Sequence, residues 1–116
     1  MYFIIFFRDI PQLKVSWEGT KAKSEWLTNI RPSRKIPYYI YPESITFEDI
    51  QRFCETRQPP RTRYDIDDIL RRDYGLRVYQ PIQMCRISRG VTMEDDLWLL
   101  FEGEEQVPYA TFSVRQ

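Results

Sequence analysis

Carboxylates are the residues in this chain that come closest to a catalytic or metal-binding pattern. A divalent metal needs oxygens that converge on one point, whereas adjacent side chains in a turn or strand point in different directions. The spacing of a calcium-binding loop is also missing. We therefore interpret the acids as solvated turn or helix-capping residues rather than a Mg²⁺ site or an acid/base pair, and we predict neither a metal nor a cofactor. The two acidic groups are Glu94, Asp95 and Asp96, and Asp65, Asp67 and Asp68.

The absence of histidine restricts the chemistry further. The 116-residue chain has no imidazole, so it lacks the commonest general base, the usual metal ligand and any Ser–His or Cys–His nucleophile pair. Its two cysteines, Cys54 and Cys85, are not arranged as CxxC and are interpreted as buried, reduced thiols. We predict that the protein is not an enzyme.

Arginine and tyrosine are the residues best suited to recognition. Thirteen of the seventeen basic residues are arginine, whose planar fork favours bidentate contacts and interfaces. Several arginines crowd a Pro-Pro connection at residues 59–60, where they could bind a phosphate or a carboxylate patch on a protein. Pairing within the chain is the alternative, with Glu55, Asp65 and Asp67 as partners. The candidates here are Arg52, Arg57, Arg61, Arg63 and Tyr64.

A second candidate surface lies at residues 36–41, Ile-Pro-Tyr-Tyr-Ile-Tyr. The pattern is typical of a strand, and Pro37 would restrict it to a sheet edge because proline removes one donor of the ladder. Exposed Tyr39 and Tyr41 beside basic residues could bind a partner by strand addition. Ordinary packing of these rings is the alternative.

Charge is balanced overall but unevenly distributed. The formal net charge is zero, so the total indicates no general affinity for nucleic acid. Residues 8–35 nevertheless hold seven Lys or Arg against three acids, and residues 94–105 hold six acids and no base. The acidic stretch could occupy a nucleic-acid channel of a target protein, or both stretches could be solvated faces.

Hydrophobic patterns predict one α+β domain over residues 1–116. The apolar run at residues 2–7 is too short to span a bilayer and has no features of a secretion signal, so we expect a cytoplasmic protein. Strands at both ends with helices between them favour a small, mostly antiparallel sheet with about three helices packed on one face. Strands are expected at 2–7, 14–17, 36–41, 97–101 and 109–114, and helices at 24–30, from Thr46 (a capping box with Asp49), at 62–70 with Gly75 as its cap, and from Pro81 to Gly90.

The C-terminal half resembles the N-terminal segment of HipA-like proteins, the serine/threonine kinase-fold toxins of bacterial toxin–antitoxin systems. The similar stretches are residues 57–63 (Arg-Gln-Pro-Pro-Arg-Thr-Arg), the helix at 64–70 closed by Gly75, and residues 88–98 (Ser-Arg-Gly-Val-Thr-Met-Glu-Asp-Asp-Leu-Trp). No glycine-rich phosphate loop and no HRD-type or DFG-type motif is present, so kinase activity does not carry over. The resemblance implies a free-standing copy of a regulatory piece that acts on such a kinase as a separate partner.

These observations predict a non-enzymatic, protein-binding regulatory module, with a HipA-like kinase toxin as the partner that the resemblance implies. The alternative is a small inhibitor from a phage or mobile element that blocks a host nuclease, as anti-CRISPR proteins do. A nucleic-acid-binding protein is the third hypothesis. The predicted contact residues are Arg57, Arg61, Arg63, Tyr64, Tyr39, Tyr41, Glu94, Asp95 and Asp96.

Overall fold

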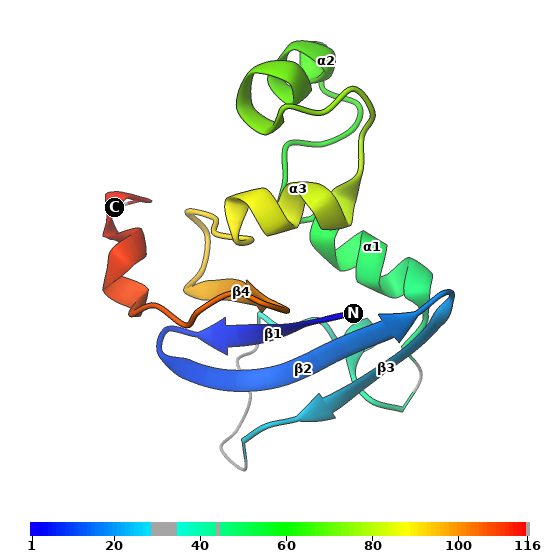
Figure 1. Cartoon of the computed structure of the whole chain (residues 1–116), viewed down its shortest axis with the longest axis vertical. Coiled ribbons are helices and arrows are strands. Elements are labelled where there is room, and N and C mark those ends of the chain that lie inside the picture. The colour runs from blue at the N-terminus through cyan, green and yellow to red at the C-terminus, as the bar shows by residue number, and fades with distance from the viewer. Residues whose placement is uncertain (29–34, 44, 116) are drawn as a thin grey trace.

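A computed structural model of the chain describes residues 1–28, 35–43 and 45–115, with side chains described as far as Phe112. Its centre is a four-stranded antiparallel sheet with the strand order β3-β2-β1-β4 (Figure 1). The α+β prediction is confirmed. The strands are β1 (Tyr2–Phe7), β2 (Ile10–Glu18), β3 (Lys21–Trp26) and β4 (Leu97–Phe101), and the helical elements are η1 (Tyr38–Ile40), α1 (Phe47–Glu55), α2 (Ile66–Ile69), η2 (Leu70–Tyr74, a π-helical turn), α3 (Pro81–Ser88) and η3 (Tyr109–Arg115).

The core lies between one face of the sheet and helices α1 and α3 (Figure 1). Alternate residues of each strand point to this face because successive side chains of a strand point in opposite directions. Phe3 of β1, for example, is fully buried and stacks against Phe53 of α1, with their ring centroids 6.3 Å apart. Each such side chain stabilises the fold by roughly 1.5–3 kcal/mol when it leaves water.

The opposite face of the sheet is only partly covered. Phe6 of β1 and Trp98 of β4 stack there at 4.6 Å, and Phe112 of η3 packs against Trp98 at 5.1 Å. The indole nitrogen of Trp98 donates to the Arg8 carbonyl at 2.6 Å, which satisfies its buried N–H group. The prediction of a final strand at 109–114 is therefore wrong. The 3₁₀ turn begins after Pro108, whose carbonyl accepts from Thr111.

Local sequence signals place the two longer helices correctly. The predicted capping box is present, because the Thr46 hydroxyl accepts from the Asp49 amide and the Asp49 carboxylate accepts from the Thr46 amide. Helix α3 begins at Pro81 and ends before Gly90, whose φ is +67°. Gly90 also has no room for a side chain, since a Cβ there would lie 2.8 Å from Leu99.

The second strand is longer than the predicted 14–17 segment. Pro11 does not break β2, because the pairing with β1 shifts between Ile5 and Phe6 and leaves a bulge at that point. The register with β3 ends at Leu13, so β3 does not need the missing N–H of Pro11.

Two further predictions of secondary structure are wrong, one of a helix and one of a strand. Part of the predicted helix at 24–30 belongs to strand β3, in which Ala22, Ser24 and Trp26 alternate toward the core; residues 29 and 30 lie outside the described residues. The predicted strand at 36–41 is the 3₁₀ turn η1, held by a buried hydrogen bond from the Ser24 hydroxyl to the Ile40 carbonyl at 2.7 Å.

Both cysteines are free and buried, as predicted. Hydrogen bonding to Cys85 and burial raise the pKa of the Cys54 thiol well above its ordinary value. The protonated Cys54 thiol therefore behaves as part of the apolar core at neutral pH. Within the described part of the chain, no helix has the length and apolar character needed to cross a membrane.

Candidate functional site

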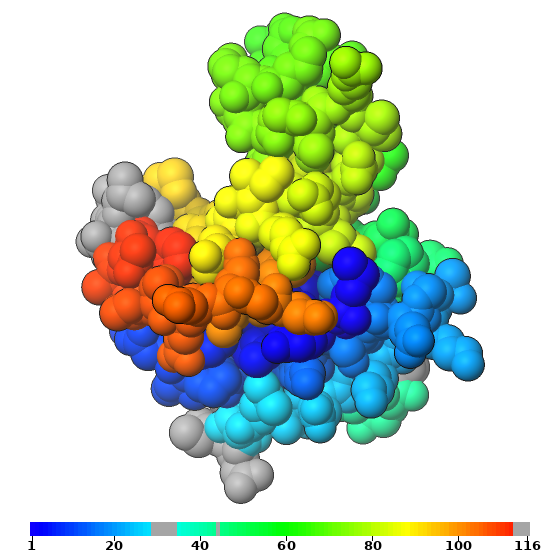
Figure 2. All heavy atoms as spheres, viewed as in Figure 1, coloured from blue at the N-terminus to red at the C-terminus, as the bar shows by residue number. Residues whose placement is uncertain are grey.

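Residues 59–79, here called the arm, leave the body of the protein between α1 and α3 (Figure 1). Figure 2 shows the arm as a separate mass that projects from the compact body. It contains α2 and η2, and Gly75 closes η2 with a left-handed φ of +66°. The Gly75 cap is confirmed, but α2 starts at Ile66 rather than near Thr62. A turn from Pro60 to Arg63 takes up the residues before it.

Two tyrosines close the base of the arm. The Tyr79 hydroxyl donates to the Pro59 carbonyl at 2.8 Å, and the Tyr74 hydroxyl donates to the Gln58 side chain at 3.1 Å. Burial raises the pKa of both phenols, so they remain donors across the neutral range. Ile69 and Leu70 are buried within the arm. These contacts hold the arm as a defined shape.

The exposed surface of the arm carries side chains that interfaces favour. Tyr64 is 96% exposed, so the folded chain gives this side chain almost no packing role, and Val78 is 62% exposed. An exposed tyrosine among arginines matches the composition of the energetic centres of protein interfaces. The arginines of the arm are Arg61, Arg63, Arg71, Arg72 and Arg77.

Carboxylates of the arm balance these arginines. Five arginines face four aspartates within residues 59–79, and most are paired locally. Arg63 contacts Asp65 at 2.7 Å, and Arg61 both contacts Glu55 at 3.5 Å and lies over the Tyr79 ring at 4.7 Å. Such exposed ion pairs stabilise a fold by about 0–1 kcal/mol each. Charged groups of a partner can therefore replace them at little cost in free energy. Within-chain pairing, the alternative for the arginines of this region, is therefore real for Arg61 and Arg63.

Arg57 is not a surface residue, contrary to its prediction as a contact. Its side chain is 6% exposed and forms a bidentate pair with Asp95 at 2.7 and 2.8 Å. It also donates to the carbonyls of Gly90 and Leu97. Arg57 and Asp95 thus join the end of α1 to the segment between α3 and β4. Because they pair with each other, neither side chain is available to contact a partner.

The acidic stretch at 94–105 does not form a continuous acidic face. Asp95 pairs with Arg57, and Asp96 contacts Arg8 at 3.0 Å and accepts from the Tyr109 hydroxyl. Glu104 contacts Arg89 at 3.1 Å. Glu94 is exposed.

Tyr39 and Tyr41 pack against the body instead of lining an edge strand. Arg52 lies over the Tyr39 ring at 4.2 Å, and burial raises the pKa of that phenol. Tyr41 meets Trp26 edge-on at 4.9 Å. Strand addition at this segment is therefore not available, because η1 offers no ladder. Packing, the alternative interpretation of these rings, is what the structure shows.

The described acids and cysteines form no metal-binding cluster. Among residues 1–28, 35–43 and 45–115, no three Cys, Asp or Glu side chains converge as a metal site would require. Three aspartates of the arm, Asp65, Asp68 and Asp73, pair with arginines, as Asp68 does with Arg71 at 2.8 Å.

Sequence reasoning overlooked the exposed Val78 and the arginines Arg71, Arg72 and Arg77. Their clustering in the turn-rich segment between two helices was the available signal. It also overlooked a basic hollow on the uncovered sheet face, lined by lysines of β2 and β3. Comparison with known proteins gives no further guide, since no family model, curated protein or solved structure matches the chain.

Proposed function

We propose that this protein is a non-enzymatic regulatory module that acts by binding another protein through the arm. The supporting observation is Tyr64, a large aromatic side chain that is 96% exposed on a projecting, locally ordered segment. Burying such a side chain in a partner's pocket supplies much of the binding energy of a typical interface.

The charge of the arm favours a protein over a nucleic acid as its partner. A phosphate backbone would meet four aspartates interleaved with five arginines. A protein surface with both signs of charge can instead pair with each of them, which gives specificity and sets the orientation of the complex. Three acids of the stretch at 94–105 pair with arginines of the chain itself. This pairing weakens the case for a nuclease inhibitor that mimics nucleic acid.

The resemblance to the N-terminal segment of HipA-like toxins indicates the first partner to test. The arm contains two of the three similar stretches almost entirely, residues 57–63 and the helix closed by Gly75. A kinase of that class, bound through the arm and regulated by it, is the form of the proposal that unites the resemblance with the exposed surface.

Charge reversal in the arm tests the proposal. Tagged protein is purified from its source cell, the bound protein is identified by mass spectrometry, and the complex is rebuilt from purified components. We expect Arg61→Glu/Arg63→Glu to lower the affinity of the rebuilt complex by about tenfold or more, because a close like charge replaces an attractive contact.

The matched control is Arg52→Glu/Arg86→Glu, a double reversal on α1 and α3 outside the arm. It is expected to leave the affinity within about threefold of wild type. Failure of the wild-type protein to retain any partner, or an equal loss for both double variants, contradicts the proposal.

A further inference from the structure

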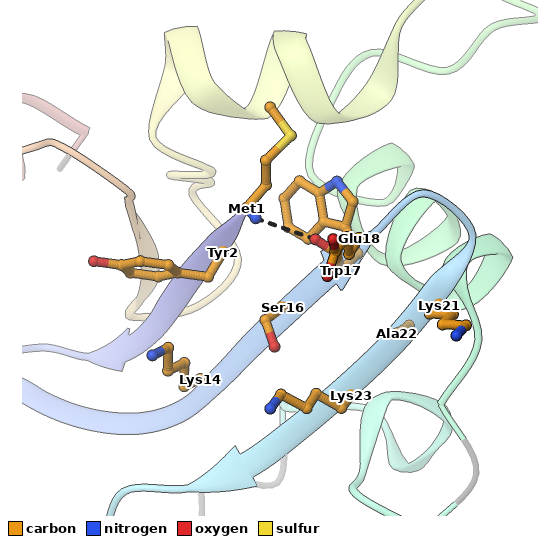
Figure 3. A pocket seen from close by; sticks show the side chains of 9 residues that line it. All are labelled: Met1, Tyr2, Lys14, Ser16, Trp17, Glu18, Lys21, Ala22 and Lys23. Atoms are coloured by element: carbon orange, nitrogen blue, oxygen red, sulfur yellow. Dashed lines mark hydrogen bonds between the residues drawn. The ribbon is translucent and has the colours of Figure 1, made fainter.

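The face of the sheet opposite α1 and α3 contains an open hollow of about 590 Å³ (Figure 3). Strand pairing sets which residues share this face. Ser16 of β2 lies between its cross-strand partners Tyr2 of β1 and Lys23 of β3, and Lys14 comes two residues before Ser16 along β2. Helix η3 covers the Trp98 part of the same face and does not line the hollow.

The hollow is positively charged. Lys14, Lys21 and Lys23 line it with one acid, Glu18, and a second acid, Glu25, is the cross-strand partner of Lys14 on the same face. None of the three ammonium groups has a carboxylate of the described residues within ion-pair distance. This local excess arises although the chain as a whole is neutral, and clustered cations of this kind raise the local concentration of anions.

The lysines are spread along the hollow instead of meeting at one point. Figure 3 shows Lys21 at the opposite end from Lys14, with Lys23 and Ser16 nearer to Lys14. Residues two apart on a strand are separated by about 6.8 Å, so Lys21 and Lys23 can each contact a different phosphate. The arrangement therefore suits an extended polyanion better than a single phosphate group.

An aromatic ring borders the cations. The Lys14 ammonium lies 4.5 Å from the centroid of the half-buried Tyr2 ring. A basic sheet surface with an aromatic side chain is the physical basis of single-strand recognition, in which lysines hold the backbone and a ring stacks on an unpaired base. From this juxtaposition we infer that the hollow is a binding site for single-stranded nucleic acid, separate from the arm.

Fluorescence anisotropy with short labelled oligothymidylate and oligouridylate at low salt tests this inference. The wild-type protein is expected to bind with a slope of log affinity against log salt of about −2, because three phosphate contacts each contribute about −0.7 for a single strand. Lys23→Gln is expected to reduce the steepness of that slope by about 0.7. Lys14→Glu/Lys23→Glu is expected to weaken binding by about tenfold or more.

The ring is tested separately from the charges. Tyr2→Leu is expected to weaken binding by about 5- to 100-fold, whereas Tyr2→Phe, which keeps the ring, binds like wild type. The control Arg52→Glu/Arg86→Glu changes two charges outside the hollow. Circular dichroism and the urea midpoint of each variant establish that the fold is retained.

Several outcomes overturn the inference. These are no binding of either oligonucleotide at low salt, tighter binding of a duplex than of a single strand, and equal binding of polyphosphate or polyglutamate. An unchanged affinity of Lys14→Glu/Lys23→Glu overturns it as well. None of these results bears on the binding of a protein through the arm, which the reconstituted complex tests on its own.

Discussion

Arg57→Ala is expected to lower the free energy of unfolding by about 3–5 kcal/mol, measured by urea denaturation. The substitution leaves the Asp95 carboxylate, 10% exposed, without its bidentate partner, and it also leaves the carbonyls of Gly90 and Leu97 without a donor. A buried charge without a counter-charge is among the most costly defects in a folded protein.

The exposed pair of Arg63 and Asp65 provides the matched control. Arg63→Ala removes a contact of the same 2.7 Å length from a side chain that is 49% exposed, and it is expected to cost about 0–1 kcal/mol. Replacement of both buried partners, as in Arg57→Met/Asp95→Leu, is expected to be less destabilising than either single loss. A cost below about 1 kcal/mol for Arg57→Ala contradicts the structural role of this pair.

Tyr64→Ala is expected to weaken the complex with the protein partner by about 2–4 kcal/mol, or roughly 30- to 1,000-fold in dissociation constant. The free energy of unfolding is expected to change little, because a side chain that is 96% exposed contributes almost no internal packing. Calorimetric titration with the purified partner and urea denaturation of the free protein measure the two quantities.

Tyr38→Ala is the control for an exposed tyrosine outside the arm. Tyr38 is 79% exposed on η1, so its removal is expected to affect neither binding nor stability. An equal loss of affinity for both tyrosine variants contradicts the assignment of the interface to the arm.

Local signals predicted the elements that depend on nearby residues. The Thr46–Asp49 capping box, the proline at the start of α3 and Gly75 at the end of η2 all act within a few residues, so each could be identified from sequence. The apolar runs of β1 and β4 were equally clear, because their central residues are buried on both faces.

Elements set by distant contacts were missed. Residues 24–26 join a strand because β2 lies alongside them, although Trp26, Leu27 and Ile30 also have helical spacing. Residues 109–114 alternate as a strand would, yet Tyr109 is held by Asp9 and Asp96 and the chain coils over Trp98. In both places tertiary contacts override the local period.

The candidate site was predicted in part. Arg61, Arg63 and Tyr64 lie on one exposed segment, as the arginine cluster beside Pro59-Pro60 indicated. Arg57 belongs to the same sequence cluster but is buried, because its partner Asp95 is 38 residues away along the chain. No spacing rule connects two charges so far apart. For the same reason the basic hollow, which only strand pairing assembles, could not be recognised in the sequence.

Hydrogen–deuterium exchange on the reconstituted complex tests most directly whether the arm is the binding surface. The account predicts that the amides of residues 59–79 exchange more slowly in the complex than in the free protein, while the outer strand β3 is unchanged. Slower exchange confined to the sheet or to η1, with the arm unaffected, would contradict it.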